Sequence, residues 1–212
     1  MEAASLPPSD LPGLDPRFSR LLTVPGRGID AGRSRVWHHL DTGPELASRG
    51  IMTAGTILAV HGNPTWSYLW RRIVSASVEA AEAGRPAWRV VAVDQLDMGF
   101  SERTGVHRPL AQRVSDLAGF TEALGLGGPV VTLGHDWGGV VSLGWAVDHG
   151  VSLAGVMMLN TAIHHPEGVP IPAPLRLAGA RGMLAASTVG TTAFLDTTLA
   201  LASPALSPAV KD

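Results

Sequence analysis

The sequence predicts an α/β fold, a doubly wound and mostly parallel sheet whose helices cover both faces. Two observations support this prediction. Short continuous apolar runs occupy residues 56–60, 88–93 and 153–159, and such runs are typical of strands buried on both faces of a parallel sheet. Stretches with helical periodicity separate these runs, and this alternation builds a parallel sheet with its ligand site at the carboxyl ends of the strands.

In chain order, the first predicted segment is an N-terminal arm over residues 1–27. Residues 1–16 hold four prolines with several acidic or small residues, a composition typical of a poorly ordered terminus. Residues 35–40 are predicted as a strand. Residues 42–55 are predicted as a loop, because Gly and Pro stand near its start and two further glycines follow.

An α/β core is expected over residues 28–165. Its first buried strand leads into a turn at residues 61–64 and then into a helix. The apolar face of that helix is formed by Trp66, Leu69, Trp70, Ile73 and Val74. A second helix is predicted over residues 110–124 and stops at Gly125. Beyond the core, residues 166–212 become proline-rich and then alanine-rich, and they are predicted to begin a helical cap.

The composition excludes several functions. Lys and Arg number 16 against 18 Asp and Glu, so the net charge is −2 and no surface for nucleic acid is expected. The chain has no cysteine, so neither disulfides nor thiolate metal sites can form. The first residues lack the apolar stretch of a secretory signal, and no apolar run reaches the ~18 residues of a membrane span. We therefore expect a cytoplasmic location.

Residues 134–139, Gly-His-Asp-Trp-Gly-Gly, carry the main functional signal. They lie between an apolar run and a helical pattern, the setting of a nucleophile elbow, which usually reads Gly-x-Ser-x-Gly. Asp136 stands where the serine would be, and Gly134 and Gly138 allow a sharp turn. The N-terminus of the following helix favours the ionised carboxylate. Such a carboxylate is suited to attack on a saturated carbon or a strained ring, although Asp is also a favoured helix N-cap.

Three loops follow the carboxyl ends of predicted strands, at residues 61–64, 94–102 and 135–139. In an open parallel sheet, loops at these ends converge on one crevice. We therefore expect Asp136 to share a site with the loop that contains Asn63.

Two motifs together resemble the haloalkane dehalogenases of the α/β-hydrolase superfamily. These are the run at residues 61–71, His-Gly-Asn-Pro-Thr-Trp-Ser-Tyr-Leu-Trp-Arg, and the elbow at residues 134–139. Residues 94–101 are similar to a strand-end loop of that family, except that Asp97 stands where glycine is common. The resemblance covers roughly residues 30–165.

The resemblance implies a function for three side chains. Asp136 would attack the halogen-bearing carbon of a small apolar substrate and form an alkyl ester with release of halide. Asn63 and Trp137 match the halide-binding pair, and their backbone N–H groups would form the oxyanion hole. Otherwise Asn63 is a turn residue and Trp137 a packed aromatic. Neither a metal nor an organic cofactor is implied.

Hydrolysis of the ester also needs a histidine that activates water and an acid that orients it. In this superfamily both follow the nucleophile in the chain. Residues 159–161 hold no carboxylate, while Asp148 lies inside the elbow helix and Asp196 inside the cap segment. We therefore expect both residues beyond position 212, in a larger enzyme of which this chain is the N-terminal part.

Three alternatives remain open. The β-lactone decarboxylases of olefin biosynthesis resemble this chain in the aspartate and in the run at residues 61–67, and Trp66 favours them. Epoxide hydrolases share the aspartate elbow, but that family carries an aromatic residue at the position of Asn63 and uses cap tyrosines, whereas the one tyrosine here is Tyr68. The third alternative is a non-catalytic fragment, because no catalytic histidine is identified.

Overall fold

The structure, a computed structural model, describes residues 2–164, 167–171, 173, 176, 191 and 196–197. The chain divides into two compact units, residues 1–163 and 164–212. The helices and strands discussed below all belong to the first unit. Most of the predicted cap, residues 166–212, lies outside the described residues.

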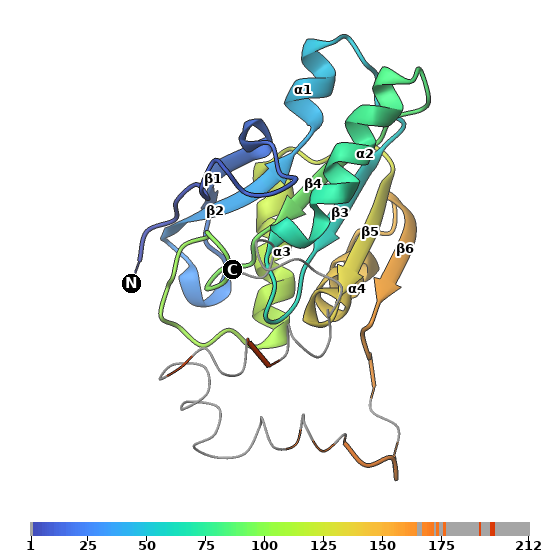
Figure 1. The fold of residues 1–212 in the computed structure, drawn as a ribbon. Coiled ribbons are helices and arrows are strands. Elements are labelled where there is room, and N and C mark those ends of the chain that lie inside the picture. The colour runs from blue at the N-terminus through green and yellow to red at the C-terminus, as the bar shows by residue number, and fades with distance from the viewer. Residues whose placement is uncertain are drawn as a thin grey trace. The chain divides into compact units, whose positions relative to one another are not determined.

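Six strands form one sheet in the order β1-β2-β4-β3-β5-β6 (Figure 1). The strands are β1 (Ser19–Pro25), β2 (Ser34–Asp41), β3 (Thr56–Val60), β4 (Arg89–Val93), β5 (Val130–His135) and β6 (Leu153–Leu159). The last four pair in parallel, and β2 joins β1 and β4 antiparallel. This arrangement confirms the predicted α/β fold with a mostly parallel sheet.

Four α-helices connect the strands. They are α1 (Gly43–Ser48), α2 (Arg71–Glu82), α3 (Leu110–Ala123) and α4 (Trp137–Asp148), with 3-10 turns at η1 (Pro16–Phe18), η2 (Gly28–Asp30) and η3 (Ser67–Trp70). The chain crosses from β3 to β4 in one direction and from β4 through β5 to β6 in the other. Because such crossovers are right-handed, α2 covers one face of the sheet, and α3 and α4 cover the other (Figure 1).

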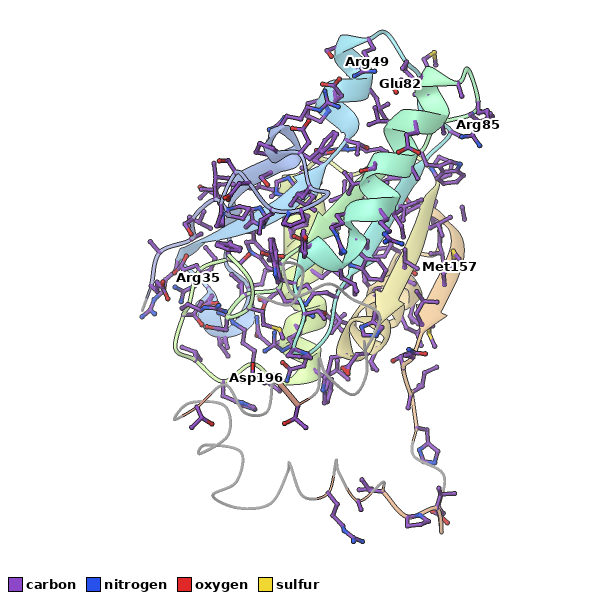
Figure 2. All side chains as sticks on the ribbon, viewed as in Figure 1. Arg35, Arg49, Glu82, Arg85, Met157 and Asp196 are labelled. Carbon is purple, nitrogen blue, oxygen red and sulfur yellow. The ribbon has the colours of Figure 1, made fainter. Side chains whose placement is uncertain are left out.

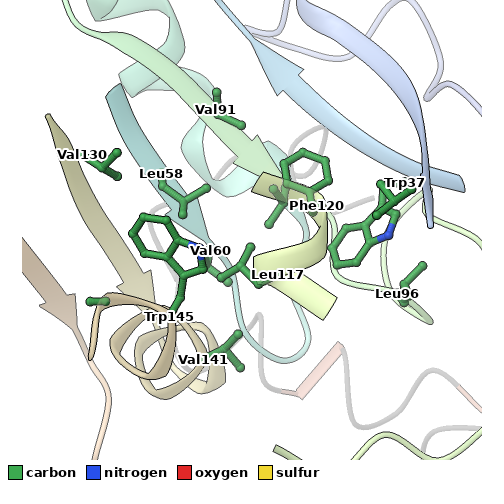
Figure 3. Packing of buried hydrophobic residues seen from close by; sticks show 13 residues of the cluster. Trp37, Leu58, Val60, Val91, Leu96, Leu117, Phe120, Val130, Val141 and Trp145 are labelled. Carbon is green, nitrogen blue, oxygen red and sulfur yellow. The ribbon is translucent and has the colours of Figure 1, made fainter. Parts of the chain in front are cut away.

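The main core fills the space between the sheet and helices α3 and α4 (Figure 3). Trp37 of β2 packs against Phe120 of α3 with ring centroids 5.2 Å apart. Trp145 of α4 is buried beside them, and its indole N–H donates to the Thr121 hydroxyl at 2.9 Å. Each large apolar side chain buried here contributes about 1.5–3 kcal/mol, and the Trp145 hydrogen bond fixes α4 against α3.

Two elements were missed by the sequence analysis. Residues 19–25, assigned to the N-terminal arm, form β1 and pair with β2 along their whole length. Residues 43–48, assigned to a loop, form α1, which has a proline in its first turn and buries Leu46. The strand exposes much of its surface and the helix has only six residues, so neither shows a clear period.

On the surface, an ion pair between Arg49 and Glu82 joins the ends of α1 and α2, with Arg49 Nη1 and Glu82 Oε1 2.7 Å apart (Figure 2).

The first residues also have fixed partners. Glu2 forms a two-hydrogen-bond bridge with Arg103, and the N–H of Ser5 donates to the carbonyl of Phe100 at 3.1 Å. The Tyr68 hydroxyl donates to the carbonyl of Pro12 at 2.6 Å. These contacts hold the segment that we predicted to be poorly ordered against the loop after β4 and the turn before α2.

A buried group of charges connects η2, the loop after β4 and α3. Arg108 is almost fully buried and pairs with Asp30, with Asp97 at 2.9 Å and with Asp116 at 2.8 Å. Burial alone would raise the pKa of Asp30, but the hydrogen bonds from Arg35 and Arg108 outweigh burial and lower it. The guanidinium of Arg108 is thus surrounded by carboxylates and has its charge satisfied within the fold.

Candidate functional site

Asp136 occupies a sharp turn between β5 and α4. Its backbone has φ 53° and ψ −127°, a region that side-chain-bearing residues rarely adopt. The end of β6 supports this turn, because the Asp136 N–H donates to the carbonyl of Leu159 at 3.3 Å and the Thr161 hydroxyl donates to the carbonyl of Asp136 at 2.7 Å. The predicted sequence of strand, sharp turn and helix is therefore present, with a strained backbone at the turn.

The carboxylate of Asp136 is half-buried and points back to the start of α4. One oxygen, Oδ2, accepts a hydrogen bond from the Trp137 N–H at 2.6 Å. The partial positive charge of the helix N-terminus favours its ionised form. Asp136 is also the N-cap of α4, so the capping and nucleophile interpretations describe the same geometry.

Glycines bring the loop after β3 into contact with the elbow. A Cβ at Gly62 would lie 2.5 Å from the Cβ of Asp136 and 2.7 Å from the Trp137 nitrogen. A Cβ at Gly138, in the first turn of α4, would collide with the carbonyl oxygens that end β3. Gly134 is part of β5 itself. The two segments can approach this closely only because they carry no side chain at Gly62 and Gly138.

His61 and Gln95 join the loop after β3 to the loop after β4. The Gln95 N–H donates to His61 Nε2 at 3.1 Å, and the Gln95 amide donates to the His61 carbonyl at 2.6 Å. Since Nε2 accepts, the proton is on Nδ1, which donates to the Gly62 carbonyl at 2.9 Å. Burial lowers the pKa of His61, so the ring stays neutral. Both ring nitrogens are occupied in holding the turn, and the strand-end loops do converge.

Asp94, at the end of β4, is a fully buried hydrogen-bond acceptor. It accepts from the N–H of Ser67 at 2.7 Å, the N–H of Phe100 at 2.8 Å and His38 Nδ1 at 2.8 Å. Burial alone would raise the pKa of Asp94, but its hydrogen bonds, first of all the one with His38, outweigh burial and lower it. Asp94 therefore organises the loops around it and is fully buried.

Asp97 has φ 69°, which explains why glycine is common at this position. Its carboxylate offsets the unfavourable backbone by accepting from the Thr104 N–H at 2.6 Å, the Thr104 hydroxyl at 2.9 Å and Arg108 Nε at 2.9 Å. Asp tolerates this conformation better than most residues. The departure from the family pattern therefore preserves the shape of the loop.

A cavity of about 330 Å³ lies beside the elbow. Its lining consists of Asn63, Gln95, Met98, His107, Arg108, Pro109, Leu110, Arg113 and Trp137. Asn63 and Trp137, the predicted leaving-group residues, thus face one space, and the Trp137 side chain is 55% exposed. By contrast, Asp148 lies at the far end of α4, about 17 Å from its start by helix rise.

Met98 comes from the loop at residues 94–102, which we predicted to converge on the site. Sequence reasoning missed the part of the lining that α3 and the residues just before it supply, namely His107, Arg108, Pro109, Leu110 and Arg113. The helical period placed Leu110 on the predicted helix but did not indicate which neighbouring residues turn toward the elbow.

Two kinds of feature are absent from the described part of the chain. No three His, Cys, Asp or Glu side chains there gather into a group that would hold a metal ion. None of the helices there combines the length and the hydropathy that crossing a bilayer requires.

Comparison with known proteins adds to this geometry. The profile of the alpha/beta hydrolase fold matches residues 55–202. A cis-3-alkyl-4-alkyloxetan-2-one decarboxylase of Xanthomonas campestris is 30% identical over 165 residues, covering 71% of this chain and 50% of that protein. Haloalkane dehalogenase 2 of Mycobacterium tuberculosis is 34% identical over 143 residues, covering 67% of this chain and 44% of that protein. The chain spans about half the length of the curated relatives it matches.

A solved haloalkane dehalogenase of Agrobacterium tumefaciens has a similar fold. It superposes with a TM-score of 0.65 at 22% identity, covering 90% of this chain and 57% of that one. At this identity the likeness concerns the fold alone.

Proposed function

The chain belongs to the alpha/beta hydrolase fold family, in its haloalkane dehalogenase-like part, and we propose that Asp136 is a nucleophile that displaces a leaving group from a small apolar electrophile. The observation that carries this proposal is the strained backbone of Asp136 at the strand–helix junction. Asn63 and Trp137 line the adjacent cavity and would bind the leaving group.

The proposed first step is the displacement of halide. A carboxylate oxygen of Asp136 bonds to the substrate carbon while the carbon–halogen bond breaks, and the electron pair leaves with the halide. The Asn63 amide and the Trp137 indole are uncharged donors, so they stabilise the halide without holding it permanently. The backbone N–H of Trp137 donates to the Asp136 carboxylate at 2.6 Å. Once Asp136 is an ester, this N–H can donate to the carbonyl oxygen of the ester.

Release of the product requires a water molecule that attacks this ester with the help of a general base. We assign this role to no described residue, because His61 holds the turn with both ring nitrogens. In the proposed scheme the base is a histidine outside the described part of the chain.

Opening of a β-lactone is a second candidate, favoured by the match to the oxetan-2-one decarboxylase over 71% of this chain. Asp136 would bond to the ring carbon attached to oxygen, and the ring oxygen would depart as part of a carboxylate. The bond to that carboxylate would then break to release CO₂, its electron pair would form the alkene, and the bond to Asp136 would break. This reaction consumes no water and needs no general base.

The experiment is covalent capture on the intact protein. After brief exposure to 1-bromohexane and acid quenching, peptide mass spectrometry should find a hexyl group on Asp136, with release of bromide. Asp136→Asn should lose this adduct, and the matched control Asp148→Asn should keep it. A folded protein without an adduct at position 136 would contradict the nucleophile assignment. Parallel incubation with a cis-β-lactone separates the two candidates, since only the second yields an alkene and CO₂.

A further inference from the structure

Arg113 places a positive charge on the wall of the cavity that Asn63 and Trp137 share. Its side chain extends from α3 and is half-buried. Its hydrogen bonds are long, from Nη1 to Gln95 Oε1 at 3.4 Å and to the Leu96 carbonyl at 3.3 Å. Within residues 2–164, no carboxylate lies within ion-pair distance of Arg113, and its Nε and Nη2 donate no hydrogen bond there.

The surrounding charges do not satisfy this guanidinium. Arg108 lines the same cavity, but three carboxylates already surround it. Asp97 acts on Arg113 from a distance, while its own oxygens are engaged by Thr104, Gly105 and Arg108. Burial lowers the pKa of Arg113, against the opposing effect of Asp97, yet a guanidinium stays charged in proteins. A half-buried guanidinium that has only two long hydrogen bonds to neutral acceptors within residues 2–164 is stabilised when an anion approaches it.

We propose that Arg113 is a specificity residue of this site, which binds the carboxylate that departs when Asp136 opens an ester-type ring. This inference rests on the proposed function and favours its second candidate. When Asp136 attacks, its negative charge passes to the departing carboxylate. The guanidinium of Arg113 then binds this new carboxylate. The planar guanidinium fork matches a carboxylate, whereas the neutral pair Asn63 and Trp137 suffices for a halide.

The rest of the cavity suits a substrate with alkyl chains. Met98 and Leu110 add apolar surface to the wall that carries Arg113. A volume of about 330 Å³ lies in the range of small-molecule sites and exceeds the needs of a halide ion alone. Apolar surface from Met98 and Leu110 beside the guanidinium of Arg113 suits an alkyl chain that ends in a carboxylate.

Calorimetry on the intact protein tests this proposal with two isosteric probes, octanoate and octanamide. Wild-type protein should bind octanoate, and Arg113→Gln should weaken that binding about 10- to 100-fold, the effect of losing a charged hydrogen-bonding partner. Octanamide binding should change less than about 3-fold. Arg113→Lys, which keeps the charge, should restore part of the octanoate affinity. Arg72→Gln, on the exposed face of α2, is the matched control and should bind both probes like wild type.

Three results would overturn the inference: no octanoate binding to wild type, unchanged octanoate binding in Arg113→Gln, or equal losses for both probes. Partial recovery of octanoate binding in Arg113→Lys, together with similar thermal midpoints for all variants, would show that a loss of binding is not caused by misfolding. Covalent capture is a separate measurement. Arg113-dependent octanoate binding without an adduct on Asp136 would overturn the proposed nucleophile alone, and an adduct without Arg113-dependent binding would overturn this inference alone.

Discussion

Adding one methyl group at Gly62 should separate the two halves of the candidate site. The new Cβ of Gly62→Ala would lie 2.5 Å from the Cβ of Asp136 and 2.7 Å from both the His135 carbonyl oxygen and the Trp137 nitrogen. Ordinary contact requires about 3.5 Å, so the elbow must shift by roughly 1 Å. Such overpacking costs about 1–3 kcal/mol, and the lower entropy of the unfolded alanine chain returns about 0.4–1 kcal/mol. The net loss of unfolding free energy should be about 1–2 kcal/mol.

The effect on chemistry should be larger than the effect on stability. A shift of about 1 Å between reacting groups costs about 100-fold in rate, so alkylation of Asp136 by 1-bromohexane should slow by that factor. Urea unfolding and adduct mass spectrometry measure the two effects. Gly150→Ala is the matched control, because a Cβ at Gly150 meets no atom within 4 Å and its φ is not positive. If Gly62→Ala matched this control in both stability and alkylation rate, the close-contact reasoning would be refuted.

Three further predictions concern the surroundings of the site. Arg108→Met should lower the unfolding free energy in urea by about 3–5 kcal/mol, because the three carboxylates around it lose their buried partner; a loss below about 1 kcal/mol would contradict this. Burial lowers the pKa of His39 from 6.5 to about 4, so the unfolded chain binds a proton that the folded chain excludes, and stability should fall by about 3 kcal/mol as pH decreases from 7 to 4. His39→Phe should remove that part of the pH dependence in parallel denaturation curves, and an unchanged slope would show that other groups cause it. Thr161→Val removes the hydrogen bond to the Asp136 carbonyl, so it should lower the free energy of unfolding by about 1 kcal/mol and slow the alkylation of Asp136. Alkylation at the wild-type rate would contradict this prediction.

Local patterns were sufficient to locate the strands that have continuous apolar runs, although β6, at the edge of the sheet, is largely exposed and not buried on both faces as we predicted. β3 and β6 begin and end where the continuous apolar runs do, and β4 differs by one residue. The elbow could also be predicted, because its signal lies in a few consecutive residues: Gly134 and Gly138 flank Asp136 between a strand and a helix. β1 was missed because Ser, Arg, Thr and Pro interrupt its apolar residues, and its pairing partner lies about 15 residues away.

The departure at Asp97 was visible in the sequence, but its meaning was not. Only the fold brings Thr104 and Arg108 to its carboxylate and shows how aspartate holds a positive φ there. The same applies to Arg113, whose two hydrogen-bond acceptors come from the loop after β4.

By itself the sequence determined the α/β fold and the place of Asp136, because hydrophobic period and glycine spacing act between residues close in the chain. Only the tertiary structure decided what shares the cavity with Asn63 and Trp137, since that depends on which side of α3 faces the strand ends. Contacts between distant segments arise from the packing of the whole sheet and its helices, and no local pattern encodes them.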